Sequence, residues 1–138
     1  MVFRKDWGQP QQGLEGFART MKAYGRKVNL SSADVSTTGN VVGAFILPAN
    51  FVVLGWYGPA VPAFGAGLVL NIGDAALNNR YLAASTIGAA GGALPAIAAT
   101  GPFFKTLADT EVQIQIGTQT TAAGAPGVLE FYLFGFAL

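Results

Sequence analysis

Cysteine and histidine are both absent from this 138-residue chain. Without cysteine there are no disulfides and no thiolate metal sites, and the redox compartment is left open. Without histidine the chain lacks the side chain that most often serves as a catalytic base near neutral pH. These two absences exclude most enzymatic designs. We therefore expect a protein that is not an enzyme and that has no catalytic residues, cofactor or metal.

Paired carboxylates offer the remaining route to catalysis, and the acidic residues of this chain are scattered. Asp109 and Glu111 are the two that stand close together in the sequence. On a strand they would share one face, as the carboxylate pair of a glycosidase must. The glutamines Gln113 and Gln115 continue that face, and this favours solvated surface charges over a catalytic pair.

Charged residues are scarce and unevenly placed. They make up 11% of the chain, against about a quarter in ordinary soluble domains. Six basic and two acidic residues give positions 1–27 a net charge of +4, whereas two basic and five acidic residues give positions 28–138 a net charge of −3. We predict two parts, an extended N-terminal anchoring arm (1–27) and a domain (28–138) whose weakly charged surface is covered by partners.

Long apolar helical runs are also missing. A membrane-spanning helix needs about 20 consecutive, predominantly apolar residues, and both uncharged stretches, 35–73 and 81–104, are interrupted by many glycines and prolines. The first residues also lack the apolar core of a secretory signal. We expect no membrane partner and a protein synthesised in a host cytoplasm.

The predicted arm combines basic and aromatic residues. Such a segment can anchor on a protein surface, where aromatic and arginine side chains supply the strongest contacts, or it can bind nucleic acid through phosphate contacts and base stacking. We favour the protein anchor. A short helix over Leu14 to Tyr24 is compatible with the apolar spacing. The predicted anchoring residues are Arg4, Lys5, Trp7, Phe17, Arg19, Lys22, Tyr24, Arg26 and Lys27.

From position 28 onward, short β-branched and apolar runs alternate with glycine and proline turns, a pattern typical of strands. Residues 112–116 show the clearest period of two, with glutamines between apolar residues. A helix near Asp74 to Leu82, with Asp74 as its N-cap, is also compatible with the sequence. This pattern predicts an all-β fold, an antiparallel sandwich or barrel. The expected strands are 41–47, 51–57, 68–72, 112–116 and 128–138.

The last of these strands is apolar on both faces. Leu129, Phe131 and Leu133 point one way, and Tyr132, Phe134 and Phe136 point the other way. Because a monomer rarely leaves an aromatic stripe in water, we predict that these three aromatic residues form a subunit interface. A central strand buried on both faces of a sandwich is the alternative.

Several short motifs resemble those of small virion proteins of tailed bacteriophages. They are Val28 to Gly43 (VNLSSADVSTTGNVVG), the Leu47-Pro48-Ala49 step, Leu70 to Asp74 (LNIGD) and Asn79 to Ser85 (NRYLAAS). The resemblance covers about residues 28–135. It implies an all-β fold, an antiparallel, jelly-roll-like β-sandwich, that acts as a capsid decoration (cement) protein or as a related head or tail component. Decoration proteins often sit as trimers on capsid axes and use terminal arms to grip the shell, so the resemblance implies a homotrimer bound to the major capsid protein. The charged arm ahead of the matching region departs from this pattern.

The expected function is therefore that of a non-enzymatic structural protein at the capsid surface of a virion. Two alternatives remain open. One is a jelly-roll coat subunit whose basic arm contacts the packaged genome, for which binding falls steeply with salt. The other is a carbohydrate-binding component of a tail fibre that uses Trp56 and Tyr57 as stacking surfaces, although core or interface packing is the commoner role of such residues.

Overall fold

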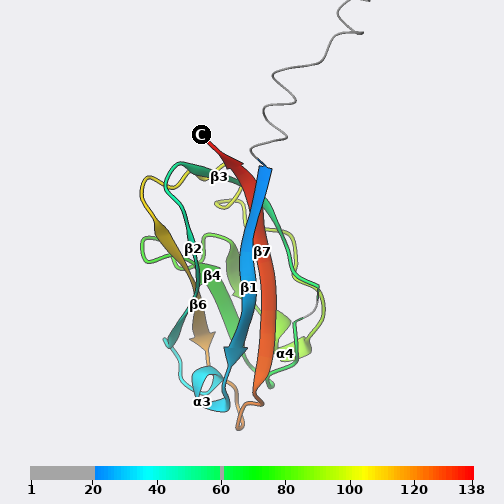
Figure 1. Ribbon diagram of the computed structural model, residues 1–138. Coiled ribbons are helices and arrows are strands. Elements are labelled where there is room, and N and C mark those ends of the chain that lie inside the picture. The colour runs from blue at the N-terminus through cyan, green and yellow to red at the C-terminus, as the bar shows by residue number, and fades with distance from the viewer. Residues whose placement is uncertain (1–20, 60) are drawn as a thin grey trace, which may run out of the picture.

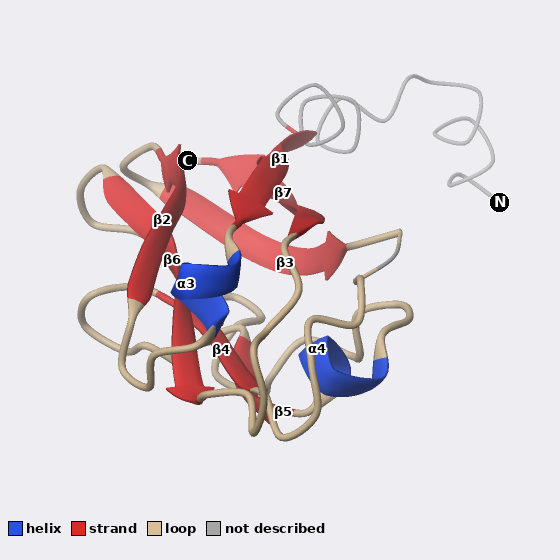
Figure 2. Cartoon of the chain, turned by 90° about the horizontal axis from the view of Figure 1, so that it is seen from below, coloured by secondary structure: helices blue, strands red, loops and turns tan. Residues whose placement is uncertain are grey.

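Two antiparallel β-sheets make up most of the regular structure in residues 21–59 and 61–138, the part of the chain that this computed structural model describes (Figures 1 and 2). The three-stranded sheet contains, in order, β1 (Met21–Leu30), β7 (Gly127–Ala137) and β3 (Phe51–Tyr57). The four-stranded sheet contains, in order, β2 (Val41–Leu47), β6 (Thr110–Thr118), β4 (Val69–Gly73) and β5 (Leu82–Ser85). The short helices are α3 (Ser32–Val35) and α4 (Ile87–Ala90). The predicted all-β antiparallel sandwich is confirmed.

The order of the strands is that of a jelly roll, in which the chain passes repeatedly from one sheet to the other. Residues 103–106 lie against the free edge of β3 and extend its sheet. The Phe103 N–H donates to the Val53 carbonyl at 2.6 Å, and the Thr106 N–H donates to the Phe51 carbonyl at 2.9 Å. With this segment counted, each layer of the sandwich has four members.

The core lies between the two sheets and follows the alternation of the strands. On β6, the side chains of Val112, Ile114 and Ile116 are fully buried, whereas Gln113 and Gln115 lie on the outer side and are half-buried. The predicted period of two is therefore confirmed. The apolar residues at every second position of β6 thus form its buried face.

A cluster of rings joins the two sheets. Phe131 of β7 packs against Phe45 of β2, with ring centroids 5.2 Å apart, and meets Trp56 of β3 edge to face at 6.1 Å. Phe131 is fully buried. Tilted and edge-to-face ring pairs are favourable beyond the area they bury, so this cluster fixes how the sheets stack.

The boundary predicted at residue 27 is wrong, because β1 begins at Met21 and pairs with β7 along its whole length, from Met21 opposite Phe136 to Leu30 opposite Gly127. Residues 21–27 therefore belong to the sandwich. β1 is an edge strand, and edge strands commonly carry charged side chains. This explains why the positive charge of the segment suggested an arm. The apolar spacing of Leu14 to Tyr24 allows a short helix, but residues 21–24 are strand, and the rest of that segment lies outside the described residues.

The region after β4 forms a turn, although the sequence is also compatible with a short helix near Asp74 to Leu82. The Asp74 carboxylate accepts hydrogen bonds from the backbone N–H groups of Ala76 at 3.0 Å and Leu77 at 2.8 Å. The side chain thus caps the turn as expected of an aspartate, but the backbone passes directly into β5. A true N-cap occurs at Ser31, whose hydroxyl accepts from the Asp34 N–H in a capping box that begins α3.

The two ends of the sandwich differ in what they carry (Figure 1). β1 begins and β7 ends at one end, where the Leu138 N–H donates to the Asn50 carbonyl and the Asn50 N–H donates to the Thr106 carbonyl. The turn at 48–50, the turn at 74–80 and residues 105–109 lie at this same end, which we call the terminal end. The helices α3 and α4 lie at the opposite end.

Candidate functional site: the aromatic face of the three-stranded sheet

The outer side of the three-stranded sheet carries a row of aromatic side chains. Along β7 the burial alternates, so that Leu129, Phe131 and Leu133 are buried while the intervening side chains lie on the outer side. The register of the sheet places β1 residues on one flank of this row and β3 residues on the other. The predicted division of β7 into two faces is confirmed. We call the outer surface the aromatic face; it comprises Ala23, Gly25, Gly55, Tyr57, Tyr132, Phe134 and Phe136.

Two glycines allow the rings to lie down on the sheet. A Cβ atom at Gly25 would lie 2.6 Å from Cδ1 of Tyr132, and a Cβ atom at Gly55 would lie 2.6 Å from Cζ of Phe134. The Tyr132 ring therefore covers β1, and the Phe134 ring covers β3. Aromatic rings that cover glycines on neighbouring strands make a sheet surface smooth and apolar. Such a surface suits close contact with another broad surface.

Solvent still reaches this face. Tyr57 is 61% exposed and Phe134 is 37% exposed. At the far end of the face, Lys27 of β1 forms an ion pair with Glu130 of β7 at 3.7 Å. Because an exposed pair of this kind contributes little to stability, its main effect is to mark where the apolar surface ends.

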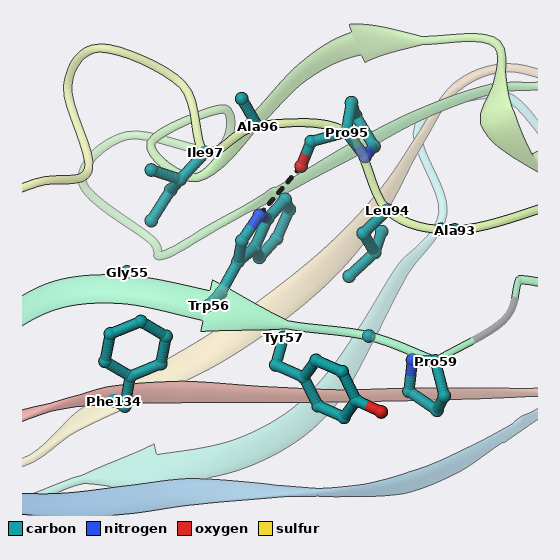
Figure 3. A pocket seen from close by; sticks show the side chains of 11 residues that line it. Gly55, Trp56, Tyr57, Pro59, Ala93, Leu94, Pro95, Ala96, Ile97 and Phe134 are labelled. Carbon is teal, nitrogen blue, oxygen red and sulfur yellow. Dashed lines mark hydrogen bonds between the residues drawn. The ribbon is translucent and has the colours of Figure 1, made fainter.

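A groove of about 510 Å³ runs beside the aromatic face, along the edge of β3 (Figure 3). Trp56 points towards Pro95 and Ile97, and its Nε1–H donates to the Pro95 carbonyl at 2.9 Å. Tyr57 and Phe134 lie on the other side of the β3 ribbon. The two residues suggested as a joint sugar-stacking surface, Trp56 and Tyr57, therefore point in different directions, and Trp56 packs against the core.

A second cluster ties the turn after β4 to the segment that flanks β3. Arg80 Nε donates to Oδ2 of Asp74 at 2.6 Å, and both side chains are largely buried. The Arg80 guanidinium carbon also lies 3.6 Å from the centroid of the Phe104 ring, a cation–π contact. Asp74 thus bonds two backbone N–H groups and one guanidinium, and through Arg80 it ties the turn after β4 to Phe104.

Tyr81 follows Arg80 and is completely buried. Its hydroxyl has no hydrogen-bond partner within the described residues. Burial is the main cause that raises the pKa of Tyr81 above its ordinary value, and the Asp74 carboxylate raises it further, while Arg80 acts in the opposite direction. A buried phenol that cannot ionise makes stability depend on alkaline pH.

We expect folding stability to fall above pH 10, the ordinary pKa of a tyrosine, because the unfolded chain then releases the Tyr81 proton and the folded chain retains it. The contribution is fully present below pH 10 and declines above it by up to about 1.4 kcal/mol per pH unit. Tyr81→Phe should remove this decline and, at pH 7, be as stable as the wild type or more so by about 1 kcal/mol. Urea unfolding from pH 7 to 11 measures both effects, and the exposed Tyr57→Phe should behave as the wild type. An unchanged alkaline decline in Tyr81→Phe would contradict this account.

Comparison with solved structures finds two that share the fold over most of its length. A chain of the cyanophage Pam1 capsid asymmetric unit has a TM-score of 0.71 and 24% sequence identity, over 86% of this chain and 85% of that chain. The fold occurs in phage capsids. A chain from the capsid of Ralstonia phage GP4 has a TM-score of 0.66 and 20% identity, over 85% of each chain. No protein-family model matches the sequence, and no curated protein sequence is significantly similar.

The predicted anchoring residues divide into two groups. Four of them lie on β1, where Lys22, Arg26 and Lys27 are exposed and Tyr24 packs its ring edge to face on Phe51 at 5.1 Å. Tyr24 therefore contributes to the sandwich. The other five, Arg4, Lys5, Trp7, Phe17 and Arg19, lie outside the described residues. Lys27 forms its ion pair with Glu130, and the anchoring role of these residues stays a prediction.

The Asp74, Arg80 and Phe104 cluster was not predicted from the sequence. Asp74 was expected as a cap, but its partner Arg80 and the Phe104 ring come together through the tertiary fold. A lone arginine between long uncharged stretches is the one signal that would have pointed to a buried pair, since an unpaired buried charge is costly. Over the described ranges, the structure contains no group of three residues able to hold a metal ion and no helix long and apolar enough to cross a membrane.

Proposed function

We propose that this protein is a non-enzymatic capsid decoration, or cement, protein of a bacteriophage. It would bind the surface of the assembled head and stabilise the shell. The observation that carries the proposal is the likeness of the jelly-roll sandwich to chains of two phage capsids over about 85% of each. Two further features support it, the aromatic face and the scarcity of charge on the domain.

The proposed mechanism is preferential binding to the assembled state. A protein that contacts neighbouring shell subunits only when they are assembled stabilises the particle by mass action. Residues 1–20, which carry Arg4, Lys5, Trp7 and Phe17, would lie along or between subunits of the major capsid protein. Arginine and aromatic side chains are the groups most often found at the energetic centre of such contacts.

Self-association forms the second part of the proposal. We assign the aromatic face to contacts between copies of this chain, three of which would form a homotrimer. The face is broad, apolar and smoothed by rings over Gly25 and Gly55, and apolar surfaces of this kind mark interaction sites on soluble proteins. Three weak shell contacts that act together would bind more tightly than one.

Deleting residues 1–20 is expected to weaken binding to purified capsids that lack this protein by at least about tenfold, the effect of losing one or more strong anchors. Co-sedimentation with capsids measures it. The deletion stops before Met21 because β1 begins there, so the truncated chain should keep the wild-type melting temperature and oligomeric state. Undiminished capsid binding by this truncated chain would refute the anchoring role.

A further inference from the structure

Exposed apolar side chains gather at the terminal end of the sandwich. Leu107 is 85% exposed, Leu138 is 71% exposed and Ile46, near the end of β2, is 60% exposed. The hydrogen bonds from Leu138 to Asn50 and from Asn50 to Thr106 place these segments beside one another. Single exposed apolar residues are normal on a protein surface, but a group of them marks an interaction site.

A groove of about 510 Å³ lies beside Leu107 at this end. Its lining includes the apolar side chains of Phe104 and Ala108, the carboxylates of Asp109 and Glu111, and the exposed ammonium of Lys105. Asp74 and Arg80, which also line the groove, neutralise each other as an ion pair, so the two carboxylates outnumber the one ammonium. Asp109 accepts a hydrogen bond from the Ala49 N–H at 3.0 Å, and within residues 21–59 and 61–138 neither acid forms a salt bridge. The groove therefore fits an apolar side chain with a basic group beside it.

The segment that presents Leu107 is held in place. The Thr106 side chain is buried, accepts the Phe51 N–H at 3.0 Å and donates to the Pro48 carbonyl at 2.5 Å. Phe104 lies under the Arg80 guanidinium, and Phe103 has a left-handed backbone with φ of 62°. A fixed surface loses little conformational entropy when a partner binds.

The terminal end is also where the proposed arm leaves the sandwich, because β1 begins there at Met21. Fully extended, twenty residues span at most about 70 Å, and the ten residues of β1 span about 33 Å. If the opposite end of the sandwich lay against the shell, the arm would first have to run back along the sandwich. It would use about half of its length in doing so. The shortest connection places the terminal end against the partner that the arm binds.

We propose that the terminal end, centred on Leu107 and the groove beside it, is the surface that the sandwich applies to the capsid shell. This inference rests on the proposed function and adds an orientation to it. The sandwich stands with its strands pointing towards the shell, and the aromatic face is turned sideways towards neighbouring copies. The shell would supply an apolar side chain and an adjacent basic group opposite Asp109 and Glu111.

The test compares full-length Leu107→Asp with full-length Val41→Asp. Val41 begins β2 towards the opposite end and is 48% exposed, so it is a matched apolar surface position. With purified capsids that lack this protein, Leu107→Asp should weaken binding at least tenfold in co-sedimentation, and Val41→Asp should stay within twofold of the wild type. Leu138→Asp, at a second exposed position of the terminal end, should weaken binding as Leu107→Asp does. All three variants should keep the wild-type melting temperature and oligomeric state.

The outcomes separate the two proposals. If the wild-type chain does not bind capsids, the proposed function fails, and this inference fails with it. If the wild type binds and Leu107→Asp and Leu138→Asp bind as well as Val41→Asp, the orientation is refuted and the proposed function stands. If Leu107→Asp instead dissociates an oligomer of the free protein, the terminal end is a contact between copies, and the orientation is again refuted.

Discussion

Replacing Asp74 by alanine is expected to lower the free energy of unfolding by about 3–5 kcal/mol. The substitution leaves the largely buried Arg80 guanidinium without its carboxylate and removes the acceptor for the N–H groups of Ala76 and Leu77. Breaking a buried pair by removing one partner costs far more than the pair contributes, because a charge then stays buried without compensation. Urea unfolding at neutral pH measures the loss.

Asp109→Ala is the matched control for this prediction. Asp109 also accepts a backbone hydrogen bond, from Ala49, but it is exposed, and among residues 21–59 and 61–138 no cationic side chain forms an ion pair with it. Its replacement should cost no more than about 1.5 kcal/mol, the upper range for one ordinary hydrogen bond. Equal losses in the two variants would show that the Asp74 and Arg80 pair has no special weight in the fold.

Replacing Phe131 by alanine is expected to cost about 3–5 kcal/mol, the usual loss for a large aromatic residue removed from a packed core. Phe131 is fully buried and contacts rings from both sheets, Phe45 and Trp56. The substitution leaves a cavity at the point where the layers meet. Thermal and urea unfolding of the variant measure the loss of folding stability.

Phe134→Ala provides a control of the same residue type on the same strand. Phe134 lies on the outer side of β7, over Gly55, and is partly exposed. Its loss should cost less than about 1 kcal/mol of folding stability, but it should shift the protein towards monomers in sedimentation velocity, because it removes a ring from the proposed interface. A large stability loss would contradict the assignment of Phe134 to the surface, and an unchanged oligomeric state would contradict the interface.

Much of the fold follows from the sequence because the period of a strand is a local property. The runs that became β2, β3 and β6 were predicted within a few residues, and the two faces of β7 were predicted correctly. When apolar residues occupy every second position, they all lie on one side of the strand, and that side is buried. This holds whichever strand pairs with it. The sandwich class could be predicted for this reason.

The errors have a common physical cause, which is that pairing between distant segments overrides local signals. The charges of residues 21–27 suggested an arm, but β7 accepts this segment as an edge strand across a separation of about a hundred residues. The apolar spacing before Tyr24 suggested a helix, and the same pairing replaced it with strand. In both cases the ladder of backbone hydrogen bonds in the sheet outweighed a weak local preference.

The sequence by itself determined five of the seven strands in the described residues, β2, β3, β4, β6 and β7. It also determined the exclusion of histidine and cysteine chemistry and the concentration of positive charge near the N-terminus. Each of these depends on residue identity or on neighbours two positions away. Only the tertiary structure decided that β1 belongs to the sandwich, that Asp74, Arg80 and Phe104 meet, and that Leu107 and Leu138 gather where the chain enters the fold. These contacts join residues far apart in the sequence, so no local pattern encodes them, and they form only when the two sheets close on their shared core.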